Sequence, residues 1–300
     1  MGGKMRTSWI GGFALLLAAL PAAAEIRIAA TTPNMGLLAE TIGGDAVDVT
    51  VMAPHDRDAH YLEARPSMMA ALRRADMVVS VGAELEVGWL PAAIDGAANP
   101  DVRAGGRGYF EGARHTDLIG VGGAADRAQG DVHPEGNPHF YMDPERFAEV
   151  GEALADRLAR FDEDRADGFH ANAADLAAAV DERMPAWREA ATDAPGVVLY
   201  HEDSDYLMAA LNVPIHGFLE PLPGVPPTAS HLRELVDGLQ GERGVVIHRN
   251  YQPADGAEFL QREIGWPVHS LPADIEPGAD LDAYFDIIEQ YVEAVTDPDA

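Results

Sequence analysis

The sequence predicts an α/β fold of two lobes with mainly parallel sheets, joined by a long rigid helix. Short apolar runs typical of buried strands alternate with helical segments in both halves of the 300-residue chain, which is the pattern of parallel α/β sheets. Between the two halves lies a long stretch whose apolar residues recur at helical spacing. The chain has no cysteine, so its stability must come from burial of a large core, and its length allows this.

The first half contains the elements of one lobe, expected to span residues 25–143. Apolar runs predict strands at residues 26–33, 47–52, 77–81 and 117–121. Helices are predicted at residues 35–42, 66–75 and 85–94. The second of these helices begins at Pro66, because proline is favoured at the first helical position.

Residues 144–191 are predicted to be helical, with a break near residues 162–164. As one helix, residues 163–191 would span roughly 43 Å, with a kink near Pro185. Such a helix suits a rigid connector between the lobes. Four apolar residues recur at helical spacing and are expected in the core: Leu176, Val180, Met184 and Trp187.

The second lobe, residues 192–300, shows the same alternation of strands and helices without a visible sequence repeat. Strands are predicted at residues 197–200, 214–218, 245–247 and 268–271. Helices are predicted at residues 206–211, 231–239, 256–264 and 281–295. Ser230 is the expected cap of the second of these helices.

Residues 1–24 have the features of a secretory signal peptide. Lys4 and Arg6 precede the apolar run 10–20, and three alanines then offer a cleavage site before Glu25. The apolar run is too short to span a membrane. No cysteine follows the cleavage site, so no lipid anchor is expected. We therefore expect a soluble periplasmic protein that begins at Glu25.

The chain is strongly acidic, with 50 acidic and 21 basic residues and a net charge of −29. Phosphate contacts need a basic surface, so nucleic acid and anionic membranes are not expected as partners. Excess negative charge favours solubility and attracts cations. Without cysteine, a metal site in this chain can use only histidine, carboxylate or water.

Three histidines, far apart in the sequence, lie near the ends of predicted elements. His60 lies beyond the second strand, His139 precedes the helical region, and His201 follows the first strand of the second lobe. Open α/β sheets place ligand sites at the carboxyl ends of their strands, so we expect a metal site in the cleft between the lobes. Asp274 follows the last strand and is the candidate fourth ligand. Zinc is typically bound by four ligands, and imidazole and carboxylate groups suit it.

Several other residues compete for roles in this site. The alternatives for the fourth ligand are Asp280, Asp282, Glu276 and His248. Glu63 and Asp143 are candidate hydrogen-bond acceptors that would fix the tautomers of the imidazoles. Asp143 is equally suited to cap the helix that follows it.

Residues 122–136 form a predicted loop that holds several glycines together with Asp131, His133 and Glu135. The simplest interpretation is a surface loop. The alternative is an accessory segment that collects metal. In that case His133 would capture an ion during transfer without holding it in the final site, because no strand or helix fixes the segment.

Three stretches resemble motifs of the cluster A-I (cluster 9) metal-binding proteins of ABC importers. Residues 58–67 (DAHYLEARPS) resemble their DPHxYEPTPS stretch, residues 137–144 (NPHFYMDP) their NPHxWLDP stretch, and residues 200–207 (YHEDSDYL) their FHDAxxYL stretch. The matches occur in order and at family-like spacing. The resemblance implies two α/β lobes joined by a long helix, with the metal between them.

The resemblance also implies that His60, His139 and His201 are metal ligands and that one Zn2+ per chain is delivered to an importer permease. Asp274, in the stretch LPADI, fits the family's SDSLG stretch loosely. His248 stands where relatives often have glutamate. The segment before His139 lacks the long histidine run of many zinc-specific relatives. This short loop resembles that of the Azt-type zinc proteins, which implies a separate periplasmic zinc chaperone. The protein is expected to be a monomer.

Three other functions compete with zinc transport. Manganese is the alternative cargo, but manganese-specific relatives tend to carry a carboxylate in place of the third histidine, and three imidazoles favour zinc. A zinc-dependent hydrolase or lyase would complete its three-histidine site with water and use Glu202 or Glu63 as a base. A protein carboxylate in the fourth position argues against catalysis, so no enzyme activity is expected. A surface adhesin is disfavoured because no lipid anchor is predicted.

Overall fold

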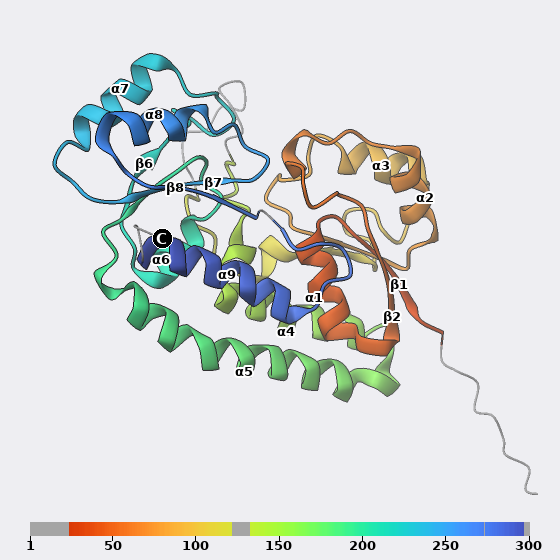
Figure 1. The fold of residues 1–300 in the computed structure, drawn as a ribbon. Coiled ribbons are helices and arrows are strands. Elements are labelled where there is room, and N and C mark those ends of the chain that lie inside the picture. The colour runs from red at the N-terminus through yellow and green to blue at the C-terminus, as the bar shows by residue number, and fades with distance from the viewer. Residues whose placement is uncertain (1–23, 122–132, 273, 297–300) are drawn as a thin grey trace, which may run out of the picture.

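The computed structural model describes residues 24–121, 133–272 and 274–296. The predicted signal peptide before Ala24 and most of the predicted loop 122–136 therefore lie outside the described residues. Figure 1 shows two lobes side by side, with one long helix running beneath both. Within the described ranges, no helix is both long and apolar enough to cross a membrane.

The N-terminal lobe is built on a four-stranded parallel sheet with the order β2-β1-β3-β4. Its elements are β1 (Ile26–Ala30), α1 (Pro33–Gly43), β2 (Val47–Val51), α2 (Pro66–Arg74), β3 (Met77–Ser80), α3 (Leu90–Ala97) and β4 (Tyr109–Glu111). Every residue of β3 is buried, because helices cover both faces of the sheet. The predicted alternation of strands and helices is confirmed in this lobe.

Three sequence predictions about local structure are wrong. The fourth strand is Tyr109–Glu111 and not residues 117–121, which are irregular and end in a turn at Val121, 65% exposed. Helix α3 begins at Leu90 and not at residue 85, because Pro91 lacks the backbone N–H that a position deeper in the helix must donate. Helix α7 (Ala229–Gly238) is capped by the Thr228 side chain and not by Ser230.

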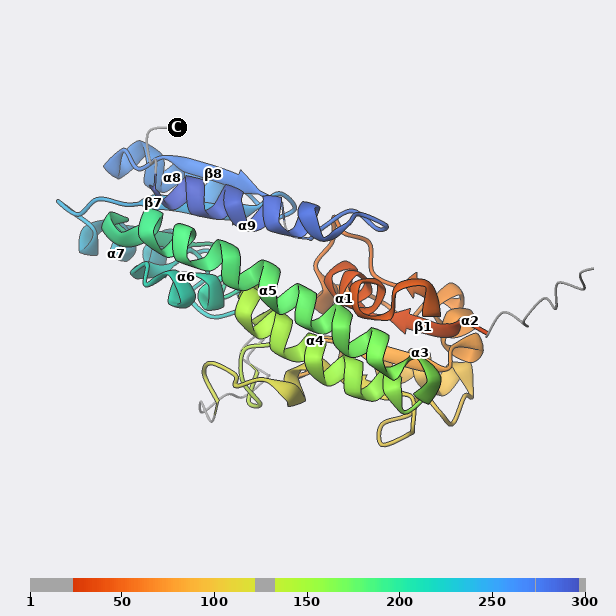
Figure 2. The same cartoon turned by 90° about the horizontal axis from the view of Figure 1, so that it is seen from below.

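Two antiparallel helices connect the lobes, as Figure 2 shows from below. They are α4 (Pro144–Ala159) and α5 (Ala166–Ala190), separated by the predicted break. Helix α5 has 25 residues and is therefore about 38 Å long. Its buried residues include all four that were predicted from their spacing, and it contains Pro185. The prediction of a long connecting helix is confirmed.

The C-terminal lobe repeats the topology of the first. Its parallel sheet has the order β6-β5-β7-β8, so both lobes place their second strand outermost and their first strand next to it. Its elements are β5 (Val197–Leu199), α6 (Asp205–Leu211), β6 (Ile215–Phe218), α7, β7 (Val245–Arg249), α8 (Asp255–Ile264), β8 (Val268–Leu271) and α9 (Leu281–Thr296). The common topology was not visible as a sequence repeat.

One continuous apolar core extends through both lobes and the connecting helices. Helix α9 contributes to it directly, because the ring of Tyr284 stacks on Phe147 of α4 with centroids 4.7 Å apart. A shared core resists large separation of the lobes, since opening it would expose apolar surface to water. The fold therefore holds the segments at the interlobe cleft in defined positions.

Candidate metal centre

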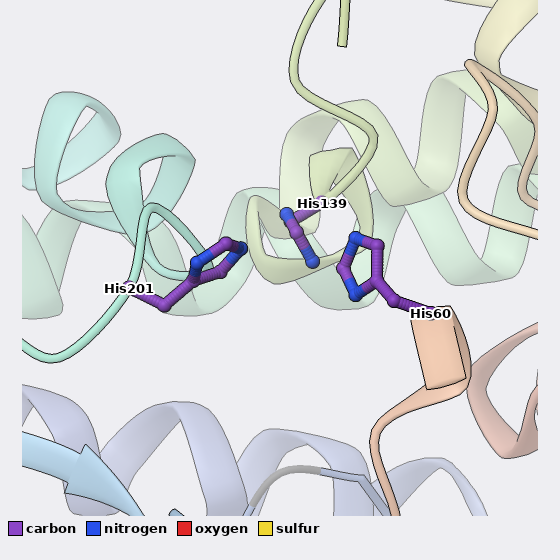
Figure 3. Close-up of side chains that lie close together, drawn as sticks. All are labelled: His60, His139 and His201. Atoms are coloured by element: carbon purple, nitrogen blue, oxygen red, sulfur yellow. The ribbon is translucent and has the colours of Figure 1, made fainter. Parts of the chain in front are cut away.

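The structure brings His60, His139 and His201 together between the lobes. One nitrogen from each ring lies within 4.8 Å of the other two. Figure 3 shows the three rings pointing toward one another from three separate segments. His60 lies in a short 3-10 turn (Ala59–Tyr61) after β2, His139 directly precedes another (Phe140–Met142), and His201 follows β5. Three imidazoles at this spacing can bind a single cation.

The three rings are largely withdrawn from solvent. His139 is 3% exposed, His201 9%, and the side chain of His60 5%. Polar groups buried this deeply need partners, and each ring has one.

Two of the rings are held by the residue two positions earlier in the chain. The Asp58 Oδ1 atom accepts hydrogen bonds from the His60 backbone N–H at 2.9 Å and from the His60 Nδ1 at 2.7 Å. Likewise, the Asn137 Oδ1 atom accepts hydrogen bonds from the His139 backbone N–H at 2.9 Å and from the His139 Nδ1 at 2.8 Å. Each oxygen can only accept, so each Nδ1 carries a proton. The Nε2 atom then keeps its lone pair for a metal.

His201 is held by a carboxylate from a distant part of the sequence. Its Nδ1 lies 2.8 Å from the Glu220 Oε2 atom, which also accepts the Gly224 N–H at 2.9 Å. All three imidazoles therefore have Nδ1 fixed by an oxygen acceptor. This arrangement orients a ligating histidine and makes it a better donor.

The surroundings give the imidazoles different affinities for protons. Burial lowers the pKa of His139 well below 6.5, and the charges of His60, His201 and Arg249 lower it further. Burial also acts to lower the pKa of His201. The hydrogen bond to Glu220 and the charges of Asp203, Glu220 and Asp58 outweigh it and raise that pKa to about 9. His201 thus behaves as a cation in a cluster of carboxylates.

Asp274 does not belong to the three-histidine cluster. Its Oδ1 atom accepts a hydrogen bond from the Asn34 side chain, in the first turn of α1. Burial raises the pKa of Asp274 to about 7, although Arg249 and the Asn34 hydrogen bond act in the opposite direction. The carboxylate thus lies at the interface of the two lobes, outside the set of three nitrogens.

The alternative fourth ligands have other contacts or are exposed. The His248 Nδ1 atom bonds to the Arg249 carbonyl at 3.0 Å, and Asp280 accepts the Ala283 N–H at 3.2 Å. Asp282 forms an exposed ion pair with Arg183 at 3.6 Å. Glu276 is exposed.

The structure places the imidazole acceptors differently from the sequence prediction. Glu63 is exposed and Asp143 caps α4 through the Glu145 N–H at 2.9 Å, as its alternative role predicted. The observed acceptors are Asp58, Asn137 and Glu220. The first two could have been found, because an Asp or Asn two residues before a histidine recurs in DAH and NPH. No local signal pointed to Glu220.

His133 also lies beside the cluster. Its Nε2 atom is 3.0 Å from the His60 Nε2 atom, and its Nδ1 is 3.0 Å from the Ala83 carbonyl. It is not one of the three residues whose nitrogens all lie within 4.8 Å of one another. His133 can therefore contact an ion bound to His60, at one side of the set.

We expect the His133→Asn substitution to slow zinc transfer from a donor chelator and leave the equilibrium Kd nearly unchanged. Asparagine keeps a donor for the Ala83 carbonyl but removes the ring nitrogen that faces His60. An intermediate in which His133 contacts the ion lowers the barrier to both binding and release. Without this intermediate, the association and dissociation rates should fall together. Stopped-flow exchange measures both rates. Deleting residues 124–131 should also preserve Kd. A large rise in Kd in His133→Asn would instead make His133 a ligand of the final site.

A hollow of about 450 Å³ adjoins His201 and is lined by residues of both lobes. Asp58 and Tyr61 contribute from the first lobe, and Tyr200, Glu220 and Tyr251 from the second. The cluster is thus next to the cleft, while its rings are shielded from bulk water.

Comparisons with known proteins agree with this architecture. Residues 28–297 match the family described as "ZnuA: Zinc-uptake complex component A periplasmic". The high-affinity zinc uptake system protein ZnuA of Paracoccus denitrificans is 28% identical over an alignment of 325 positions that covers 95% of each chain.

Solved structures show the same fold. A crystal structure of ZnuA matches with a TM-score of 0.75 at 23% identity, covering 92% of this chain and 100% of that one. FpvC from Pseudomonas aeruginosa, solved in complex with Mn2+, matches with a TM-score of 0.77 at 21% identity, covering 91% and 97%. Together with the match over nearly the whole sequence, the fold and the three-histidine cluster lead to one conclusion: this chain belongs to the ZnuA family of periplasmic zinc-uptake components, the metal-binding proteins of ABC importers.

Proposed function

We propose that this chain captures Zn2+ between its lobes with His60, His139, His201 and Asp274 and delivers it to the permease of an ABC importer. The main support is the cluster of three imidazoles, each with Nδ1 bound to an oxygen and a nitrogen directed at its neighbours. Asp274 now accepts a hydrogen bond from Asn34 and would complete a tetrahedral set by turning from Asn34 toward the histidines.

The donor set supports zinc as the cargo. Three imidazoles, which bind a metal in their neutral form, and one carboxylate suit a borderline cation, whereas manganese prefers sites richer in oxygen. FpvC shows that this fold can also hold Mn2+, so the choice of metal depends on the side chains and not on the fold. Manganese is therefore the alternative cargo that a direct comparison must exclude.

The same geometry does not favour catalysis. A three-histidine zinc enzyme needs an open position for water and a base near it. Glu63, one of the two candidate bases, is exposed. A fourth protein ligand from Asp274 would close the position that water needs.

Export and partners follow from the same proposal. Residues 1–24 would direct the chain to the periplasm, and the absence of cysteine from the whole sequence argues against a lipid anchor. The protein would act there as a monomer, receive zinc from a periplasmic chaperone in addition to free ions, and pass it to the permease. The pair of nearby imidazoles at His60 and His133 would suit a step-by-step transfer from such a donor.

We expect zinc to raise the melting temperature of the mature protein far more than manganese does. A ligand present at a thousandfold excess over its Kd adds about 4 kcal/mol of stability, which for a chain of this size is a rise on the order of 10 °C. Scanning calorimetry with equal concentrations of each metal would measure the difference. Equal or greater stabilisation by manganese would overturn the assignment of zinc.

A further inference from the structure

Both ends of the Asn137 side-chain amide form hydrogen bonds, one end with His139 and the other with the segment that follows His201. Its Oδ1 atom accepts the two hydrogen bonds from His139 described above. Its Nδ2 atom donates to the Glu202 carbonyl oxygen at 2.6 Å. Asn137 is 8% exposed, so water does not replace these partners easily, and each bond contributes to a fixed geometry.

The Glu202 carbonyl belongs to the residue directly after His201. One amide therefore connects the ring of His139 to the segment that carries His201, although the two histidines are 62 positions apart in the sequence. Asp58 has the same position relative to His60 but can only accept hydrogen bonds, and Glu220 supports His201 alone among the three rings. Asn137 thus joins one of the three imidazoles to the backbone segment that carries another.

The backbone of Asn137 is held independently of its side chain. Its N–H donates to the Ile119 carbonyl at 2.8 Å, and its own carbonyl accepts the Tyr206 hydroxyl at 2.6 Å. The same hydroxyl accepts the Ile119 N–H at 2.9 Å. A change of side chain at position 137 should therefore leave the backbone in place, which makes substitution informative.

The chemistry of the two bonds explains why position 137 carries an amide. An aspartate there would keep an acceptor for His139, but its second oxygen would face the Glu202 carbonyl without a proton to share. A carboxylate has no donor when ionised, whereas asparagine supplies an acceptor and a donor on a side chain of the same shape. The contact with Glu202 thus requires the amide.

We propose that Asn137 is a positioning residue that couples His139 to His201, so that the two imidazoles keep a common geometry for the cation. This proposal rests on the proposed function, since it assigns Asn137 to the same site. It adds that the donor end of Asn137 contributes to metal binding separately from its acceptor end.

The decisive variant is Asn137→Asp, compared with Asn137→Ala and wild type. Losing the support of a ligating histidine typically lowers metal affinity by about 10- to 100-fold, and we expect this for Asn137→Ala. Asn137→Asp keeps the acceptor for His139 and adds a negative charge, which by itself would favour a cation. A zinc affinity that is still clearly below wild type in Asn137→Asp therefore identifies the donor end. An affinity equal to or above wild type would overturn the proposal.

Two further measurements separate positioning from general damage. With Co2+ as the probe, the visible absorption bands report ligand geometry, and we expect them to shift in Asn137→Asp. The melting temperature without metal should fall by only a few degrees, which corresponds to the cost of one unpaired buried oxygen. Unchanged bands would contradict the proposal. The matched control is Asp58→Asn, at the same position relative to its histidine but without a contact to Glu202.

Amide hydrogen exchange distinguishes failure of this proposal from failure of the proposed function. Without added metal, Asn137→Asp should speed exchange in residues 200–204, whereas Asp58→Asn should not. If wild type bound no zinc, the proposed function would fail, yet faster exchange in Asn137→Asp alone would still support the coupling. Equal exchange in both variants would refute it, whatever the metal affinity.

Discussion

Replacing His139 with alanine is expected to lower zinc affinity by on the order of 100- to 1,000-fold. Zinc sites with four protein ligands bind with roughly 10–16 kcal/mol, so one ligand accounts for about 2.5–4 kcal/mol, and 1.4 kcal/mol is a factor of ten in Kd. His139 is only 3% exposed, so water would have to enter an enclosed space to replace it. His60→Ala and His201→Ala should have effects of similar size.

Competition titration against a chelator of known affinity would measure these losses. Asp274→Ala should lower zinc affinity only about tenfold, because water can take the place of an oxygen ligand. This loss is no larger than the loss expected for a residue that only supports a ligand. His170→Ala is a suitable control, since that side chain is 49% exposed and lies 3.8 Å from Asp156 on the surface. Wild-type affinity in His139→Ala or His201→Ala would mean that zinc binds elsewhere.

The sequence was sufficient to predict the two-lobed α/β fold, because its apolar runs are short, buried and regularly separated by helices. The long helix was predictable from the spacing of Leu176, Val180, Met184 and Trp187, all of which are buried. The strand at residues 109–111 was missed because three residues give too little periodicity. The apolar residues Leu118 and Ile119 were mistaken for a strand because they pack on the core from a turn.

The supports of the imidazoles were harder to predict than the imidazoles themselves. The motifs around His60, His139 and His201 are local, so the sequence displays them. Glu220 reaches His201 only because β6 lies next to β5 in the sheet. Such a contact depends on strand order, which spacing along the chain does not encode. Asn34 and Asp274, 240 positions apart, meet for a similar reason, since each lobe contributes one of them.

Zinc affinity should fall about tenfold for each pH unit between pH 9 and pH 7, because His201 must lose a proton before it can bind a metal. The ordinary pKa of histidine is 6.5, and the carboxylates around His201 raise it to about 9. Below about pH 7 the fall should become steeper, since burial raises the pKa of Asp274 to about 7 and a protonated carboxyl cannot ligate either. His139 adds nothing in this range, because its pKa is lowered.

Without metal, the contribution of His201 to the stability of the fold depends on pH in the direction opposite to zinc affinity. A group whose pKa is raised in the folded state stabilises the fold fully below its unfolded value, here 6.5, and loses that contribution as the pH rises through about 9. The stabilisation produced by zinc should therefore grow with pH from two causes. At high pH the proton no longer competes with the metal for the imidazole of His201. The bound metal also restores a positive charge beside the carboxylates, which the imidazole lost when it was deprotonated.

Calorimetric titration at pH 8 in buffers of different ionisation enthalpy would count the protons released, and we expect about one per zinc, from His201. The matched variant is Glu220→Gln, which keeps an oxygen near Nδ1 but removes the charge that raises the pKa of His201. It should release fewer protons and flatten the pH dependence between pH 7 and 9, while lowering the affinity at pH 9 by about 10- to 100-fold. At high pH the carboxylate helps the imidazole bind zinc, whereas at low pH it helps the proton. A wild-type affinity that does not change between pH 7 and 9 would show that Glu220 fixes only the orientation of His201 and not its charge.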